Sequence, residues 1–549
     1  MSQESESYQN NSQPLPLHEL LSRLLKSEKT SHRHPLPIMG TLQDLNQAWE
    51  RRPLLDFINT SLRGIGQVGF ANNPITGLLI TLAVFLQSPW VALMLVVGVV
   101  VATWTAYLMG LDRPSIRNGI FGLNGSLVGL ALGTFGTWGN GTGNLLWVLA
   151  VIICAALSTV LMQYLGLWMA VYLGLPSMGV PFHIVTYSFL VIALYVPQPF
   201  FELGAPPPFP NPAESLDGVS VLSGLITGIG QIFFSGSLVS ALLIIIALAL
   251  CSPMGALVAV LGSVIGLVTG IVLGVNLNVL YAGLWGYNSA LTAIAIGGIF
   301  YAPNRRSLLC ASGGAFGAAL IGWLLTLVMT PLKLPILSMS FQLGTYACFV
   351  ILQRSLSSLV PVAPYSIASP EEHRFRYLTA KEVISAFRRQ LQGAMVGQHH
   401  KVLFDKAPQE LKGDLRYIFD AIDRDQSGSL SLTELSYHFQ QAGHSISDDE
   451  LNFVFSSMDV DNSGEIDFEE FGELLLRHRR LMSRLNEFAT YFIPIDKNKN
   501  GVVELEEMNI VLASVDQPPL SEDEVTFLQQ RIGGKELNWE GFLELLLVI

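Results

Sequence analysis

Charged side chains are scarce in the middle of this 549-residue chain. Those between Gly64 and Gln353 occur in small clusters that separate long apolar runs: Asp112, Arg113, Arg117, Glu202, Glu214, Asp217, Arg305, Arg306 and Lys333. Apolar runs of about 20 residues, broken by short charged loops, are typical of helices that cross a bilayer. The scarcity of charge therefore predicts a polytopic helical membrane domain.

Cysteine is also rare, and the chain has no cleavable leader that we can identify. The four cysteines, Cys154, Cys251, Cys310 and Cys348, lie in apolar runs without a CxxC pair, which excludes a disulfide framework and a cysteine metal site. Residues 1–50 are polar and lack an apolar h-region, so the first spans are expected to serve as the insertion signal. Within them Leu17–Lys26 is either a short amphipathic helix or part of a loosely ordered cytoplasmic tail.

No nucleophile–base constellation and no phosphate-binding loop occurs, so an enzyme is not expected. No nucleic-acid partner is expected either.

Negative charge is concentrated at the end of the chain. From Gly413 onward there are 27 Asp and Glu against 10 Lys and Arg, a balance of −17 where the whole chain has −12. The low overall pI thus belongs to a soluble acidic domain, residues 413–549, and says nothing about the membrane domain at 51–353.

The membrane part contains an internal repeat with an offset of 164 residues. Gly283–Gly297 is Gly-Leu-Trp-Gly-Tyr-Asn-Ser-Ala-Leu-Thr-Ala-Ile-Ala-Ile-Gly, and Gly119–Gly133 matches it without a gap at its glycines, its Asn and one Leu. Gly64-Ile-Gly-Gln67 recurs as Gly228-Ile-Gly-Gln231, and Ser88-Pro89 as Ser252-Pro253. Glycine-broken apolar segments in corresponding places of two halves are a pointer to a transport site, because irregular backbone at membrane depth must line protein or a water-filled path.

The repeat predicts an all-α fold of two halves, about 54–197 and 218–352, joined by a proline-rich connector. If each half crosses the membrane an odd number of times, the second is inverted relative to the first and the total number of spans is even. The glycine-broken segments would be re-entrant pore helices. The apolar runs that carry this expectation are Leu54–Phe70, Ile75–Gln87, Pro89–Gly110, Gly119–Phe135, Leu145–Leu173, Val180–Val196, Val221–Phe234, Leu238–Leu250, Pro253–Gly274, Gly283–Tyr301, Leu308–Met329 and Pro335–Leu352.

The motifs of both halves resemble the urea transporter family. The resemblance rests on Gly-Gln-Val-Gly-Phe-Ala-Asn-Asn-Pro-Ile-Thr-Gly-Leu-Leu before Ile80, on Gly-Leu-Asn-Gly and Gly-Tyr-Asn-Ser, and on two Leu-Pro…Phe segments. It runs from about Leu54 to Leu352. It implies a homotrimer in which each protomer has its own channel-type pore for urea.

A selective path for urea must replace its hydration, since unpaired polar groups in an apolar medium cost several kcal/mol. Gln67 and Gln231 are neutral amides at equivalent positions, and Leu123 with Leu127, like Tyr287 with Leu291, shares a helix face. The apolar members of this set are either pore walls or ordinary core packing. The resemblance implies pore positions at Gln67, Val68, Phe70, Leu123, Leu127, Gln231, Ile232, Phe234, Tyr287, Leu291 and Ser338.

The chain departs from the family pattern in several places. The threonine expected before each Pro-Phe corresponds to Gly179 and Ser338, so one hydroxyl is missing and one belongs to serine. Leu123 stands where an aromatic is common, and the second half lacks the Asn-Pro-x-Thr-Gly of the first. His183, the histidine within the spans, is either a functional ionisable group or a hydrogen-bonded neutral core residue.

The acidic domain contains three twelve-residue loops, 423–434, 459–470 and 496–507, that resemble EF-hands of the calmodulin-like superfamily. Ca²⁺ takes oxygen ligands from positions 1, 3, 5, 7, 9 and 12, with glycine at position 6. The expected ligand positions are Asp423, Asp425, Ser427, Ser429, Ser431, Glu434, Asp459, Asp461, Ser463, Glu465, Asp467, Glu470, Asp496, Asn498, Asn500, Val502, Glu504 and Glu507. A degenerate fourth loop at 530–541 would complete two hand pairs as a metal-free partner.

The linker between the two domains, residues 354–412, carries a helical pattern. Val383, Ile384, Phe387 and Leu391 recur at helical spacing beside Arg388 and Arg389. Such a helix fits an EF-hand groove or an anionic leaflet, or it packs on the hands as a plain linker.

These observations predict passive, channel-type transport of urea or a small amide, with Ca²⁺ regulation through the tail. The alternative is a membrane-anchored calcium sensor or buffer with a vestigial transporter domain. Because Arg51, Arg52, Arg354, Arg374 and Arg376 flank the membrane domain, both termini of this multi-pass cell-membrane protein are expected in the cytoplasm.

Overall fold

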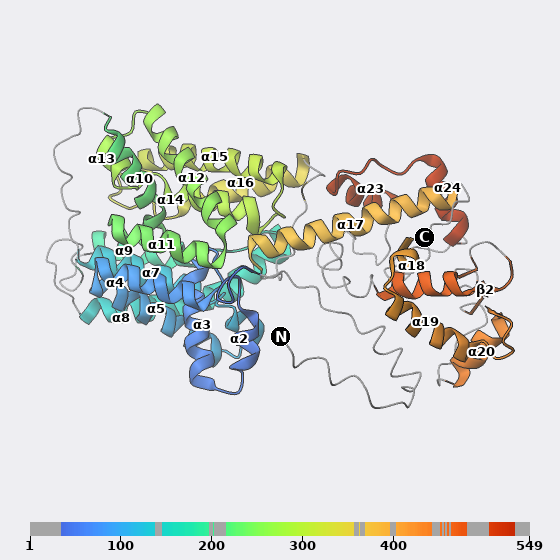
Figure 1. Cartoon of the computed structure of the whole chain (residues 1–549). Helices are drawn as coiled ribbons and strands as arrows, with labels where there is room; N and C mark the ends of the chain where they lie inside the picture. Colours follow the sequence, from blue (N-terminus) through green and yellow to red (C-terminus); the bar gives the residue numbers. More distant parts are fainter. Residues whose placement is uncertain are drawn as a thin grey trace, which may run out of the picture. The chain divides into compact units, whose positions relative to one another are not determined.

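The structure is a computed structural model of the whole chain (Figure 1). It describes residues 34–137, 145–196, 201, 216–355, 359, 362, 368–395, 402–441, 451–452, 455, 458–459, 463–479 and 504–532. The chain divides into two compact units, His32–Tyr377 and Leu378–Ile549 together with Met1–Ser31. The segments expected as a short helix at Leu17–Lys26 and as a fourth loop at 530–541 lie outside the described residues, apart from the last turn of a helix at 530–532.

The first unit is helical, and its helices form two halves. The first half contains α2 (Gln43–Ala48), α3 (Pro53–Gln67), α4 (Pro74–Gln87), α5 (Pro89–Leu108), α6 (Arg113–Arg117), α7 (Gly122–Thr137), α8 (Leu145–Trp168), the π-helical turn η1 (Met169–Leu173) and α9 (Val180–Tyr195). The second half contains α10 (Gly218–Gly230), the 3₁₀ turn η2 (Gln231–Phe233), α11 (Leu238–Cys251), α12 (Pro253–Val272), α13 (Leu277–Tyr281), α14 (Tyr287–Ile294), the π-helical turn η3 (Ala295–Ile299), α15 (Arg305–Met329) and α16 (Met339–Ser355).

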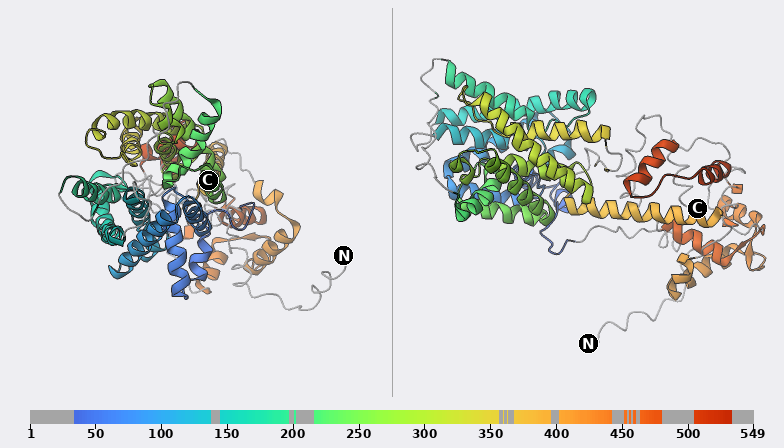
Figure 2. Two further views of the ribbon diagram at one scale, coloured as in Figure 1. Left: turned by 90° about the vertical axis from the view of Figure 1, so that its left-hand side faces the viewer. Right: turned by 90° about the horizontal axis from the view of Figure 1, so that it is seen from above.

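The bounds of α4, α5 and α6 shifted by 164 residues are the bounds of α11, α12 and α13. The local cause is visible at α5 and α12, where a serine cap precedes a proline. The Ser88 hydroxyl accepts from the Val91 amide at 3.3 Å, and that of Ser252 accepts from Gly255 at 2.8 Å. Proline fits the first helical position because its missing N–H needs no partner there. The blue-to-cyan first half and the green-to-yellow second half lie side by side, with α4 against α11 (Figures 1 and 2).

Several of these helices have the length and composition of membrane spans. Four qualify singly: Pro89–Leu108, Leu145–Leu173, Pro253–Val272 and Arg305–Met329. Gly218–Phe233 and Leu238–Cys251 qualify together and are bent by 70° at their break. Large apolar side chains such as Leu108 and Leu145 are exposed on the outside, as lipid-facing residues are. The first unit is therefore a multi-pass membrane domain.

Small residues bring the helices of this unit into close contact. A Cβ placed at Gly129 of α7 would lie 2.1 Å from the Met94 carbonyl oxygen of α5, and one at Gly262 of α12 would lie 2.6 Å from the Ser289 carbonyl of α14. Only glycine permits the backbones to approach this closely. In a membrane, where lipid competes for apolar contacts, such close packing drives the association of helices. Close packing through glycine is thus present in both halves.

Helix α17 (Pro370–Met395) begins in the first unit and continues in the second from Leu378 on. It is much longer than the predicted amphipathic segment. The second unit further contains α18 (Val402–Lys406), α19 (Gln409–Ile422), β1 (Ser429–Leu430), α20 (Leu432–Gln441), β2 (Ile466–Asp467), α23 (Leu505–Ser514) and α24 (Glu522–Ile532). β1 and β2 pair antiparallel, with Ser429 opposite Asp467 and Leu430 opposite Ile466.

Candidate functional site

The membrane unit encloses a cavity of about 1180 Å³ that both of its halves line. The eleven positions expected along the pore all border it: Gln67, Val68, Phe70, Leu123, Leu127, Gln231, Ile232, Phe234, Tyr287, Leu291 and Ser338. Among the described residues that line it, none is Asp, Glu, Lys or Arg. The cavity therefore offers neutral polar groups between apolar walls.

The two glutamines are held in equivalent ways. The Gln67 amide nitrogen Nε2 donates to the Asn118 carbonyl at 2.9 Å, and Nε2 of Gln231 donates to the Ala282 carbonyl at 2.8 Å. Because a carbonyl can only accept, each amide is oriented with its NH₂ toward the backbone. Within the described part of the chain, neither Oε1 receives a hydrogen bond, so each cavity-lining glutamine keeps a free acceptor.

Aromatic rings form walls next to the glutamines. Phe70, three residues after the end of α3, and Phe234, which follows η2 directly, lie in the left-handed region with φ of 59° and 56°. This conformation is uncommon for a bulky residue and persists only where the surroundings impose it. The Phe70 ring packs edge-on against Phe300 and Phe341 at centroid distances of 6.1 and 5.9 Å. Sequence reasoning did not identify these last two rings as cavity residues.

The asparagines of the repeated glycine-rich segments are structural. The Asn124 side chain donates to the Met178 carbonyl at 3.2 Å and accepts from the Phe182 amide at 3.0 Å. Asn288 does the same with the Leu337 carbonyl at 3.1 Å and the Phe341 amide at 3.3 Å. Each asparagine thus fixes the turn that precedes α9 or α16.

The turns before α9 and α16 place Gly179 and Ser338 on the cavity wall. The Gly179 amide donates to Oε1 of Gln342 at 3.1 Å. Ser338 Oγ lies 3.2 Å from Nε2 of His183, whose Nδ1 lies 2.8 Å from the Gly179 carbonyl. His183 is only 6% exposed, so the structure favours the hydrogen-bonded core histidine. The sequence analysis did not identify Gln342 as a partner of the cavity wall, although it follows Phe341 as His183 follows Phe182.

The start of α17 lies at the cavity, which the sequence did not predict. Ala368 and the buried His373 line it. The Glu371 carboxylate accepts from the Met254 amide at 2.7 Å, and that of Glu372 accepts from the Thr41 hydroxyl at 3.3 Å. Burial, and then the nearby Arg376, lower the pKa of His373 to about 3, so the ring is neutral near pH 7.

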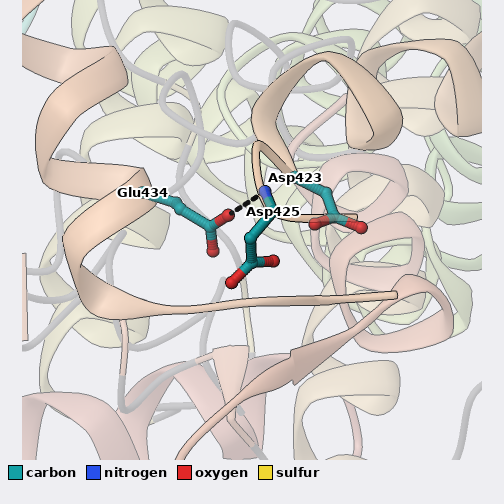
Figure 3. Close-up of side chains that lie close together, drawn as sticks. All are labelled: Asp423, Asp425 and Glu434. Atoms are coloured by element: carbon teal, nitrogen blue, oxygen red, sulfur yellow. Dashed lines mark hydrogen bonds between the residues drawn. The ribbon is translucent and has the colours of Figure 1, made fainter. Parts of the chain in front are cut away.

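The first acidic loop brings three carboxylates together (Figure 3). Asp423, Asp425 and Glu434 each offer a carboxylate oxygen, and these oxygens lie within 4.8 Å of one another. Asp423 accepts from the amides of Ser427 and Gly428 at 3.0 and 2.9 Å. Three converging carboxylates with further oxygens nearby fit the preference of Ca²⁺ for six to eight oxygen ligands.

Hydrogen bonds favour the ionised form of two of these carboxylates, Glu434 and Asp425. Burial alone would raise the pKa of Glu434, but hydrogen bonds from Ser431 and Arg424 outweigh it and place this pKa below its ordinary value. The pKa of Asp425 is lowered as well, because Ser427 donates to its carboxylate. Ionised carboxylates are the form that binds a divalent cation.

The second loop repeats the arrangement where it is described. Asp459 accepts from the amides of Ser463 and Gly464, each at 2.8 Å, and Glu470 accepts from the Asp467 amide at 3.0 Å. Through β1 and β2 the two loops form one pair. Asp461 lies outside the described residues, as do Asp496, Asn498, Asn500 and Val502 of the third loop. Of that loop the structure describes Glu504 and Glu507, which cap α23.

Three of the four residues on the predicted apolar face of α17 are buried in the second unit. Ile384, Phe387 and Leu391 are at most 3% exposed, whereas Val383 is only half-buried. Arg388 is bonded to the segment between α23 and α24. Its guanidinium donates to the carbonyls of Pro518 and Pro519 and pairs with the Glu524 carboxylate at 3.1 Å. α17 is therefore fastened to α24 and to the segment that follows α23, the helix that carries Glu507 at the last ligand position of the third loop.

Known proteins resemble this chain over both units. A family model described as urea transporter matches residues 58–353, and one described as EF-hand domain pair matches residues 412–476. Urea transporter 1 of Ovis aries is 32% identical over 348 residues, which cover 62% of this chain and 89% of that protein. Urea transporter 1 of Rattus norvegicus is 31% identical over 352 residues, or 63% and 90% of the two chains. Calcium-dependent protein kinase 32 of Arabidopsis thaliana is 30% identical over 113 residues, 21% of each chain.

Proposed function

The chain belongs to the urea transporter family, which is not a family of enzymes, and we propose that its membrane unit is a passive channel for urea or a closely related small amide. The observation that carries the proposal is the pair of oriented glutamines. Urea is planar and neutral and presents four N–H donors. Gln67 and Gln231 offer fixed, unused acceptors to such donors on the wall of one cavity.

The walls support a neutral solute over an ion. Phe70 and Phe234 border the path with flat apolar surfaces, and the described lining carries no carboxylate, guanidinium or ammonium group. A hydrated cation would lose its water there without gaining a charged ligand, whereas a planar amide keeps its hydrogen bonds. The eleven positions expected from the family resemblance, all of which border the cavity, are therefore our candidates for the conduction path.

The 164-residue offset supports two inverted repeats, with domain limits near those expected from the sequence. An odd number of crossings in each half would invert the second half and leave both termini on one side of the membrane. The arginines that flank the membrane unit would make that side the cytoplasm. Following the family resemblance, the assembly would be a homotrimer with one pore in each protomer. Access of protease to the acidic tail from outside intact cells would contradict this orientation.

The acidic tail would bind Ca²⁺ through its loops, with the first two acting as a pair. The carboxylates of Asp423, Asp425 and Glu434 support this, as does the strand pairing between the loops. The third loop, with the degenerate fourth as its metal-free partner, would form a second pair.

Calcium would regulate the channel through α17. The first turn of this helix carries His373 on the cavity wall, and its later turns are fastened by Arg388 to the chain that follows the third loop. A ligand shifts a conformational equilibrium only through its different affinity for the two states. Ca²⁺ binding that moves α23 would therefore act on α17 and so on the lining of the cavity.

Stopped-flow urea flux in proteoliposomes, with and without Ca²⁺, tests both parts. We expect flux well above that of protein-free vesicles, and a Ca²⁺ response that Phe387→Asp and truncation after Arg354 remove. A chain that binds Ca²⁺ but carries no urea would support the alternative of a membrane-anchored calcium sensor. Equal responses in all three proteins would exclude regulation through α17.

A further inference from the structure

Two hydrogen bonds at the cavity wall connect the two halves of the membrane unit. His183 and Gln342 each follow a cavity residue, Gly179 or Ser338, by four positions. Each side chain reaches the other half. His183 Nε2 meets Ser338 Oγ at 3.2 Å, and Gln342 Oε1 accepts from the Gly179 amide at 3.1 Å. Ser338 and Gly179 border the cavity, while His183 and Gln342 are buried behind them.

The hydrogen bonds of His183 determine which of its nitrogens carries the proton. Nδ1 lies 2.8 Å from the Gly179 carbonyl oxygen, which can only accept, so Nδ1 must be the N–H donor. In the neutral imidazole Nε2 is then an acceptor. The Ser338 hydroxyl, which lies against Nε2, must therefore donate its proton to His183.

We propose that His183 is a positioning residue that makes the Ser338 hydroxyl a hydrogen-bond acceptor for the solute, and thereby favours solutes with many N–H donors. An unrestrained hydroxyl can rotate to donate or accept, so it serves a carbonyl as well as an amine. With its proton held by His183, the Ser338 oxygen has only lone pairs left for the cavity. Gly179 offers no competing side chain on the other half.

This inference rests on the proposed transport function and concerns its selectivity. Urea and acetamide are both planar and similar in size, but acetamide has two N–H donors where urea has four. Acceptors at Gln67, Gln231 and Ser338 distinguish between these solutes, whereas a site of mixed donors and acceptors would distinguish them less.

The test is a double-mutant cycle read as the ratio of urea flux to acetamide flux in proteoliposomes of the full chain. We expect Ser338→Ala and His183→Leu each to lower the ratio about fivefold, which corresponds to the ~1 kcal/mol of one net hydrogen bond. In the Ser338→Ala background, His183→Leu should have no further effect on the ratio. His183→Gln keeps an acceptor, as Gln342 does in the other half, and should retain most of the ratio.

A histidine that only supports the packing of α9 would reduce both fluxes together, in either background, and leave the ratio unchanged. That result would overturn the assignment while leaving urea transport established. Acetamide flux also reports whether each variant still forms an open path. If His183→Leu does not carry acetamide, His183→Gln alone is used for the test. A ratio in His183→Gln as low as that of Ser338→Ala would then overturn the assignment. If the unmodified chain carries no urea, the proposed function fails and this assignment fails with it.

Discussion

The cavity of the membrane unit and the loops of the acidic unit both present oxygen atoms to a ligand, but they hold these oxygens in opposite ways. In the cavity, Gln67 and Gln231 donate their N–H groups to backbone carbonyls and keep a neutral oxygen free. In the loops, backbone amides donate to carboxylates, as the Ser427 and Gly428 amides do to Asp423. The first arrangement yields fixed neutral acceptors, and the second yields fixed charged ones.

This difference matches the ligands that we propose for the two units, a neutral solute for the cavity and a divalent cation for the loops. Neutral acceptors replace the hydration of a polar solute without holding it strongly, which passage requires. Converging carboxylates hold a divalent cation strongly, because its charge offsets their mutual repulsion. α17 has residues in both units, so substitutions in this helix test whether the proposed transport and the proposed Ca²⁺ binding are linked.

The largest effect is expected from a substitution that loosens the attachment of α17 to the acidic unit. Arg388→Ala leaves the Glu524 carboxylate, 3% exposed, without its cationic partner, and losing one side of a buried pair costs about 3 kcal/mol or more. Hydrogen exchange should show the later turns of α17 opening at lower free energy, and the Ca²⁺ response of urea flux should disappear. Lys381→Ala is the matched control, because the Lys381–Asp516 pair is 36% and 49% exposed and should contribute well under 1 kcal/mol. Equal effects of the two substitutions would contradict this role of Arg388.

The next effect concerns the neutral acceptors. Gln67→Leu or Gln231→Leu removes the free oxygen and should raise the barrier to urea by ~1–3 kcal/mol, lowering the flux roughly tenfold or more. Gln43→Leu provides a control, since Gln43 bonds the Asn118 side chain but does not line the cavity, and its flux should change little. Undiminished flux in both pore variants would remove these glutamines from the path.

The helical framework could be predicted because its signals are local. Ser88-Pro89 and Ser252-Pro253 begin helices by capping and by proline geometry, and the apolar runs that follow match α5 and α12 closely. The family was likewise correctly identified from short contiguous motifs, most of which lie at helix ends and in the turns between helices. The cavity residues expected from that resemblance do lie together, although their part in transport is still a proposal.

The parts that could not be predicted depend on contacts between distant segments. Nothing near Glu371 indicates that its carboxylate caps the start of α12 at Met254, 117 residues away. The left-handed conformation of Phe70 opposes its local preference and is imposed by tertiary packing. Gln342 has the sequence context of an ordinary helical residue, and only the structure shows that its Oε1 accepts a hydrogen bond from the Gly179 amide.

The two acidic loops should differ in affinity by a smaller factor. By sequence, 459–470 has four carboxylates at side-chain ligand positions and 423–434 has three. One further charge near the cation in a solvated site is worth on the order of 1 kcal/mol, or roughly fivefold in affinity. Calorimetry of Glu470→Gln and Glu434→Gln should show that the first substitution removes the tighter site. Loss of the same site in both variants would count against this order.

The smallest expected effect comes from returning a hydroxyl to Gly179. A Cβ there would lie 3.4 Å from Gln342 Oε1 and 3.6 Å from His183 Cε1, which is ordinary contact, so Gly179→Ser should fold without rearrangement. A second neutral acceptor opposite Ser338 should raise urea flux about twofold, equivalent to ~0.5 kcal/mol. Gly179→Asp supplies at the same point the charged acceptor of the loops and should lower the flux, because a carboxylate in the cavity retains water and cations. If urea flux rose in both variants, any oxygen at this position would suffice. The neutral charge of the cavity acceptors would then not be what distinguishes them from the carboxylates of the loops.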